Sequence, residues 1–119
     1  MERIRTIEHA GKEILVFDYG GLDPDGYRQL MKDVIRTLSF RPPASVRTVT
    51  IVKGTRFGVG AADDIKAYSA AVRPYVRASA VVGLSALQRV IFHAVRPFLS
   101  STLETFGSVE DAAAWLSQQ

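Results

Sequence analysis

Apolar residues follow two different periods along the chain, and residues 77–99 carry both in succession. Ala78–Leu84 is a short apolar run, as expected for a strand that is buried on both faces. Apolar residues then recur at steps of three and four, which predicts a helix with one buried side: Leu87, Val90, Ile91, Ala94, Val95 and Phe98. A buried strand followed by such a helix is half of a βαβ unit, so we expect this stretch at the centre of the fold.

The N-terminal part of the chain predicts a hairpin followed by a helix. Arg3–His9 alternates polar and apolar residues, as edge strands do, and Glu13–Tyr19 is a denser apolar strand. Residues 10–12 between them form a turn, so the two strands can pair. Asp23 followed by Pro24 is typical of a helix start. The apolar face of this helix comprises Tyr27, Leu30, Met31, Val34, Ile35 and Leu38.

The remaining segments continue the alternation of strands and helices. Arg47–Lys53 predicts a strand and Ala61–Arg73 a helix, with a glycine-rich loop between them. Pro97 should kink or end the helix that contains it, because its ring clashes with the preceding turn. Thr102–Phe106 predicts a short last strand, and Ser108 the start of a final helix.

This order predicts an α/β fold: a four- to five-stranded mixed sheet, with an N-terminal antiparallel hairpin, then parallel βα units and flanking helices. If every right-handed crossover steps the same way along the sheet, the helices fall on one face. The other face then needs cover from a terminal helix, a partner chain or a ligand. No linker divides the sequence, so we expect a single domain over residues 1–119.

Composition narrows the functional classes. The chain is 47% apolar and 23% charged, and its lack of cysteine excludes disulfides and thiolate metal sites and fits a cytoplasmic protein. No apolar run approaches the roughly 18 residues of a membrane span, and the polar start is not a signal peptide. The net charge of +3 comes from scattered arginines without a basic block, so we do not expect nucleic-acid binding.

Three segments resemble the small bacterial STAS-like family related to sporulation anti-anti-sigma factors: GKEILVFDYGGL, AVVGLSALQRVIFHAVRPF and FGSVEDAAAWL. The resemblance implies a sheet flanked by helices, an architecture similar to that of lipid-carrying CRAL-TRIO domains. Anti-anti-sigma proteins carry a phosphorylatable Ser or Thr in an Asp-x-Ser/Thr motif after the third strand. Thr55 is the nearest hydroxyl here, but Lys53 stands where the acidic residue is expected, which argues against phospho-switching.

The loop Gly54–Gly60 precedes a helix, and its amides with Lys53 and Arg56 could hold an anion. It lacks the Gly-Lys-Ser/Thr of a P-loop, and Asp63 and Asp64 in the first helical turn would repel an anion, so a plain connecting loop is the alternative. We expect Thr55→Ala to leave the fold intact. The predicted partner or anion contacts are Gly54, Thr55, Arg56 and Phe57.

Aromatic and basic residues of the second half offer two further sites, each with a structural alternative. Tyr68, Phe92 and Phe98 could line an apolar pocket, although aromatic residues at helical spacing also form ordinary core. Four arginines could converge and bind an acidic partner, or lie solvated on apolar surface: Arg73, Arg77, Arg89 and Arg96.

Candidate catalytic groups are few. Asp18 could be a buried carboxylate with a raised pKa, or a strand-end residue that hydrogen-bonds the following turn. His9 and His93 have no partner at metal-ligand spacing, and we expect no cofactor. We therefore predict a non-enzymatic regulatory or protein-interaction domain that acts as a homodimer or through partner contact. The alternative is a carrier of a small apolar ligand or lipid in a pocket between sheet and helices.

Overall fold

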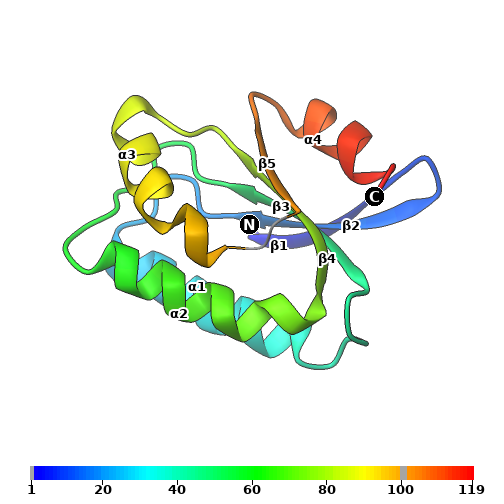
Figure 1. Cartoon of the computed structure of the whole chain (residues 1–119), viewed down its shortest axis with the longest axis horizontal. Coiled ribbons are helices and arrows are strands. Elements are labelled where there is room, and N and C mark those ends of the chain that lie inside the picture. Colours follow the sequence, from blue (N-terminus) through cyan, green and yellow to red (C-terminus); the bar gives the residue numbers. More distant parts are fainter. Residues whose placement is uncertain (1, 100–101) are drawn as a thin grey trace.

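The computed structural model describes residues 2–99 and 102–119, and its centre is a five-stranded sheet with the order β1-β2-β3-β4-β5 (Figure 1). The strands β1 and β2 pair antiparallel, and β2 to β5 are parallel. This arrangement confirms the predicted mixed α/β sheet. The strands are β1 (Ile4–His9), β2 (Lys12–Asp18), β3 (Val46–Ile51), β4 (Val76–Val82) and β5 (Leu103–Phe106). The helices are α1 (Pro24–Leu38), α2 (Ala61–Val72), α3 (Ala86–Val95) and α4 (Val109–Leu116).

The predicted hairpin is present, and its turn residues explain its tightness. Ala10 and Gly11 have φ angles of 51° and 78°, which suit the two-residue turns that match the twist of paired strands. Two hydrogen bonds from Arg3 Nη1, to the carbonyl oxygens of Asp18 (3.0 Å) and Gly20 (2.9 Å), fix the far end of the hairpin.

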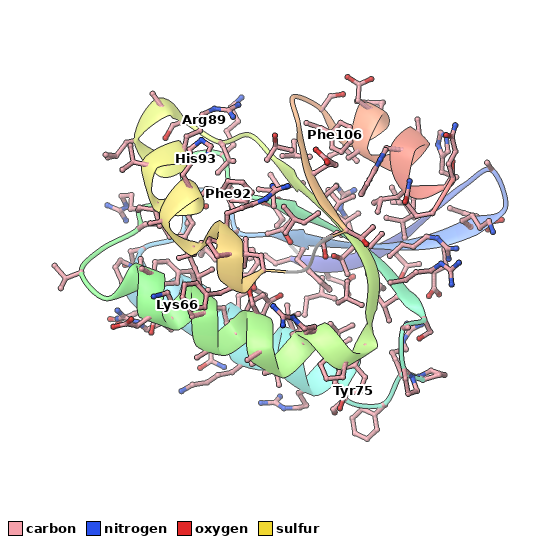
Figure 2. The ribbon with its side chains drawn as sticks, in the orientation of Figure 1. Lys66, Tyr75, Arg89, Phe92, His93 and Phe106 are labelled. Atoms are coloured by element: carbon pink, nitrogen blue, oxygen red, sulfur yellow. The ribbon has the colours of Figure 1, made fainter. Side chains whose placement is uncertain are left out.

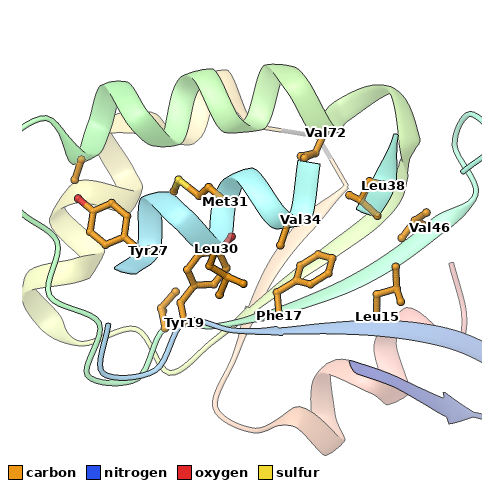
Figure 3. Close-up of a cluster of buried hydrophobic side chains, with 12 residues drawn as sticks. Leu15, Phe17, Tyr19, Tyr27, Leu30, Met31, Val34, Leu38, Val46 and Val72 are labelled. Carbon is orange, nitrogen blue, oxygen red and sulfur yellow. The ribbon is translucent and has the colours of Figure 1, made fainter. Parts of the chain in front are cut away.

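The helices divide unequally between the two faces of the sheet. Each parallel connection steps to the next strand in the same direction, so α1, α2 and α3 share one face (Figure 1). On that face α1 packs on β2, where Phe17 and Leu15 meet Val34 and Leu38 (Figure 3). The terminal helix α4 covers the opposite face, where Leu116 packs among residues of β2, β3 and β4. One of the three predicted kinds of cover, a terminal helix, is therefore the one found.

The strand β4 lies between β3 and β5, one place from the middle of the sheet, and Val82 is buried. The prediction of a buried strand feeding a helix is confirmed. The predicted inward face of that helix is wrong for four residues: Leu87 is 76% exposed, Val90 66% and Phe98 50%, and Ala94 is exposed as well. The residues of α3 that are buried are Gln88 and Val95.

A polar residue sets the rotation of α3. Ser85 caps the helix and Gln88 completes a capping box, with Gln88 Oε1 accepting from Ser85 N at 2.8 Å. Gln88 Nε2 also donates to the carbonyl oxygens of Val52 and Thr55, both at 2.9 Å. Because these bonds hold Gln88 inward, residues on the opposite side of the helix, such as Leu87 and Val90, face outward.

Proline ends α2 and α3 in the same way. Short 3-10 turns follow directly: η1 (Arg73–Tyr75) after α2 and η2 (Arg96–Phe98) after α3. Each turn places proline at its second residue, where the missing N–H leaves no helical hydrogen bond broken. The expectation that Pro97 ends its helix is confirmed.

Candidate functional site

The loop after β3 does not present its predicted contacts on one surface. Thr55 is 5% exposed, and its Oγ1 donates a 2.7 Å hydrogen bond to the carbonyl oxygen of Tyr19. Phe57 is half-buried, with its ring centroid 5.4 Å from that of Tyr27. Only Gly54 and Arg56 of the four predicted contacts are exposed. The Thr55 hydroxyl is therefore buried and engaged in a hydrogen bond within the fold.

The start of α2 is acidic and is tied to α1. Gly60 caps the helix without a side-chain hydrogen bond, and Asp63 and Asp64 follow in the first turn. Asp64 accepts a 2.8 Å ion-pair hydrogen bond from Arg28 of α1, which raises the pKa of the Arg28 guanidinium. Two carboxylates thus occupy the helix end at which an anion would have to bind.

The outer face of α3 carries a run of exposed apolar residues. We call it the α3 stripe: Ala86, Leu87, Val90 and Ala94, continued by Pro97 and Phe98, all of them exposed. Arg89 and His93 are exposed beside it and project from the same side of the helix (Figure 2). Large apolar side chains held in water without a partner are the usual mark of an interaction surface.

The segment of the sequence that contains the α3 stripe is rich in positive charge. Residues 65–103 contain five Lys and Arg residues and no Asp or Glu, whereas all 12 acidic residues lie outside this range. Lys66 Nζ of α2 stands 4.3 Å from the centroid of the Phe98 ring, and the Arg96 guanidinium stands 5.3 Å from that of Phe92. The predicted arginine cluster is only partly free, because Arg73 donates to the carbonyl oxygen of Phe98 and Arg96 to that of Leu103.

A cavity of about 140 Å³ lies beneath α3, between the sheet and the three helices on that face. Tyr68 and Phe92 line it as predicted, whereas Phe98 is half-exposed on the outside and does not. The volume is smaller than the roughly 300 Å³ at which pockets for drug-sized ligands begin. The predicted pocket residues are therefore brought together only in part.

Two buried phenols line this cavity. Tyr19 is 3% exposed, and its Oη has no hydrogen-bond partner among the described residues. Burial raises the pKa of Tyr19 far above its ordinary value, and the neighbouring Tyr68 hydroxyl raises it further. Burial also raises the pKa of Tyr68, to about 12. Both side chains are therefore neutral at physiological pH.

The remaining candidates are structural or isolated. Asp18 Oδ1 accepts a 2.8 Å hydrogen bond from Gly20 N, which confirms the turn-stabilising alternative for this carboxylate. His9 and His93 are both exposed. Within residues 2–99 and 102–119, no three His, Cys, Asp or Glu side chains gather closely enough to hold a metal ion.

Comparison with known families agrees with this architecture. The family model described as SpoIIAA-like matches residues 14–117. The chain belongs to the SpoIIAA-like family. A comparison with curated proteins finds no match.

Two solved structures share the SpoIIAA-like fold at low sequence identity. A crystal structure of an uncharacterized protein from Shewanella loihica PV-4 has a TM-score of 0.72 and 18% identity, over 95% of this chain and 91% of that one. An anti-sigma-factor antagonist (STAS) domain protein from Planctomyces limnophilus has a TM-score of 0.63 and 11% identity, over 96% and 97%. At these identities the likeness establishes the fold.

Sequence reasoning missed the α3 stripe of this SpoIIAA-like domain because it assigned Leu87 and Val90 to the core. One local signal could have located it: Ser85 and Gln88 have the spacing of a capping box. A glutamine fixed by that cap at the third helical position is a candidate for the inward face. In the part of the chain that the structure describes, no helix has both the length and the apolar character to cross a bilayer.

Proposed function

We propose that this SpoIIAA-like domain is a non-enzymatic regulatory module of the cytoplasm that binds a protein partner through the α3 stripe. The observation that carries the proposal is the exposure of Leu87 and Val90, at 76% and 66%, on a helix whose inner face is held against the sheet layer by Gln88 and Val95. The family membership supports a regulatory or interaction role. The anti-sigma-factor antagonist with a similar fold supports it in the same general way.

The partner that best fits the α3 stripe is an amphipathic helix with acidic residues along one flank. A ten-residue helix such as α3 is about 15 Å long, which gives a straight apolar strip for another helix to lie along. Arg89 and His93 run beside that strip, and residues 65–103 offer no acidic residue to repel a carboxylate. Opposite charge along the flank would set the partner's orientation.

Two other occupants fit less well. An antiparallel pairing of two copies through the α3 stripe would place Arg89 of one copy on the same side as Arg89 of the other, so like charges would meet. A membrane would gain little, because Leu87, Val90 and Phe98 together offer no more apolar carbon than one acyl chain, and one chain gives only marginal membrane binding. A homodimer and a membrane contact are therefore outcomes of the test.

The test uses two synthetic helical peptides with the same leucine face, one flanked by Glu and the other by Lys. We expect the Glu-flanked peptide to bind saturably and to shift amide NMR signals of α3, and the Lys-flanked peptide to bind at least tenfold more weakly. Val90→Asp should abolish the difference, because it places a carboxylate in the middle of the stripe. Arg5→Glu, an exposed change on β1, is the matched control and should bind like the wild type.

Three results would overturn this proposal. The first is equal binding of the two peptides, or shifts that map away from α3. The second is binding to vesicles of anionic lipid in preference to the Glu-flanked peptide. The third is a dimer in native mass spectrometry that Val90→Asp converts to monomer, which would make a second copy the occupant of the stripe.

The alternative of a carrier receives only partial support. The cavity is in the predicted place, between sheet and helices, but at about 140 Å³ it cannot enclose a long acyl chain. A lipid-carrying function is therefore not proposed.

A further inference from the structure

We infer that the cavity beneath α3 is a binding site for a small neutral molecule, with an apolar body the size of a single ring and one hydrogen-bonding group. This site is separate from the α3 stripe, and the inference does not depend on partner binding. It is carried by the volume of the cavity, by the chemistry of its walls and by one buried hydroxyl that has no partner.

The volume defines the size of the ligand. Apolar cavities of about 150 Å³ inside proteins take up benzene, so the space of about 140 Å³ here, which is partly open to solvent, has room for a single six-membered ring. Such a space is too small for a nucleotide or a fatty acid. The ligand class is therefore defined by a compact body and not by a long chain.

The walls make the site apolar. They come from the sheet and from all three helices of that face, and include Phe17, Met31, Ile65, Val81, Phe92 and Val95. On β4 the residues that face the cavity, Ser79 and Val81, remain half-buried, whereas Ala78 and Ala80 on the other face are 0% exposed against α4. This contrast is what incomplete packing between the sheet and the helices produces.

The polar groups of the walls favour a neutral ligand, because they are hydroxyls and amides apart from one arginine; Thr50, Ser69 and Tyr68 contribute hydroxyls besides Tyr19. The charged residue of the lining, Arg73, is already committed to the carbonyl oxygen of Phe98. Thr48 Oγ1 donates to Ser79 Oγ at 3.2 Å, so the Thr48 hydroxyl proton is already engaged within the wall. The Tyr19 hydroxyl makes no hydrogen bond of good geometry among the described residues, although the Tyr68 hydroxyl lies close enough to raise its pKa. A buried hydroxyl without a well-formed hydrogen bond is unfavourable.

A ligand that brings a hydroxyl or carbonyl oxygen into the cavity would satisfy Tyr19. At neutral pH the Tyr19 side chain is a protonated donor, since burial raises its pKa. A plain hydrocarbon would fill the same space without that bond. The chemistry therefore favours a phenol-like or cyclic ketone-like molecule over a pure hydrocarbon.

The experiment compares phenol with toluene, two probes of nearly equal shape that differ by a hydroxyl in place of a methyl group. Binding is followed by amide NMR shifts in titrations of the full chain. We expect saturable binding of both probes with shifts around the cavity, and tighter binding of phenol. Tyr19→Phe should weaken the binding of phenol about tenfold, which corresponds to one hydrogen bond of ordinary strength. The binding of toluene should be unchanged.

Two leucine substitutions on α2 provide the matched controls. Ser69 lines the cavity, so Ser69→Leu should fill it and abolish binding of both probes. Ala70 is exposed on the next position of the same helix, so Ala70→Leu should bind as the wild type does. Thr50→Leu fills the cavity from β3, and it replaces Ser69→Leu if a thermal melt shows that variant to be unfolded.

The inference is overturned if the wild-type chain shows no saturable shift with either probe at millimolar concentration. It is also overturned if both folded leucine variants at the cavity bind as well as the wild type. If Tyr19→Phe weakens the binding of phenol and the binding of toluene by the same factor, the role of the Tyr19 hydroxyl is refuted. A failure of the peptide experiment on the α3 stripe would leave these measurements unaffected, because they report on the inner side of the helix.

Discussion

Thr55 and Gln88 join three segments that are distant in the sequence. The Thr55 hydroxyl donates to the carbonyl oxygen of Tyr19 at the end of β2, and Gln88 of α3 donates to the carbonyl oxygens of Val52 and Thr55. Both side chains are at least nine-tenths buried. Loss of either side chain would leave carbonyl oxygens buried without partners, which is unfavourable in a protein interior.

We accordingly expect Thr55→Ala to lower the free energy of unfolding by about 1–3 kcal/mol, because the carbonyl oxygen of Tyr19 loses its hydrogen bond. Urea unfolding followed by circular dichroism measures this change. Thr6→Ala, at an exposed position of β1, is the control and should change stability by less than about 0.5 kcal/mol. Equal stability of Thr55→Ala and Thr6→Ala would contradict this prediction. It would support the expectation from the sequence that Thr55→Ala leaves the fold intact.

At the scale of elements, α1 and α3 show what a periodic pattern can predict. In α1 the buried residues Tyr27, Val34 and Leu38 are those that the sequence pattern indicates, because charged residues occupy the opposite side of that helix. In α3 apolar residues occupy both sides, so the pattern does not distinguish inner from outer. Its rotation depends on the bonds of Gln88 to a loop more than 30 residues away in the chain, which no local pattern contains.

The rotation of α3 predicts opposite results for two truncations in one helix. Val95 is 1% exposed, so Val95→Ala should destabilise the fold by about 1–3 kcal/mol through lost packing. Leu87 is 76% exposed, so Leu87→Ala should change stability by less than about 0.5 kcal/mol. Thermal and urea unfolding of both variants measure the difference, and a larger loss in Leu87→Ala would contradict the observed rotation.

At the scale of the whole molecule, the order of elements predicts the layers well. Every crossover steps the same way, so helices gather on one face and α4 is needed on the other. The cavity could not be predicted in this way. Its walls come from four strands and three helices, and its volume is the small remainder of their packing. Tyr68 and Phe92 were suggested by residue type, but the unpartnered hydroxyl of Tyr19 emerges only in three dimensions.

The two buried phenols make the stability of the whole fold sensitive to alkali. Burial raises the pKa of Tyr68 from 10.0 to about 12 and raises that of Tyr19 in the same direction. The folded state therefore holds these protons more tightly than the unfolded chain. The contribution of the two protonated phenols to the stability of the fold is complete below pH 10. It is lost as the pH rises toward 12 and beyond.

We expect the free energy of unfolding to fall in this alkaline range, and to fall less steeply in Tyr68→Phe, which removes one of the two protons. Urea unfolding at a series of pH values, with phenolate absorbance recorded alongside, measures both effects. The expectation fails if stability is constant over this range while all four tyrosines of the chain ionise in the folded state.

The two sides of α3 have different surroundings: Gln88 and Val95 face the cavity, and Leu87 and Val90 face outward. Reciprocity then applies to any two molecules that bind across it. If phenol inside changes the affinity of the acidic peptide outside, the peptide must change the affinity of phenol by the same factor. A single helical layer, about 10 Å across, would thereby transmit a chemical signal from the interior of the domain to its surface.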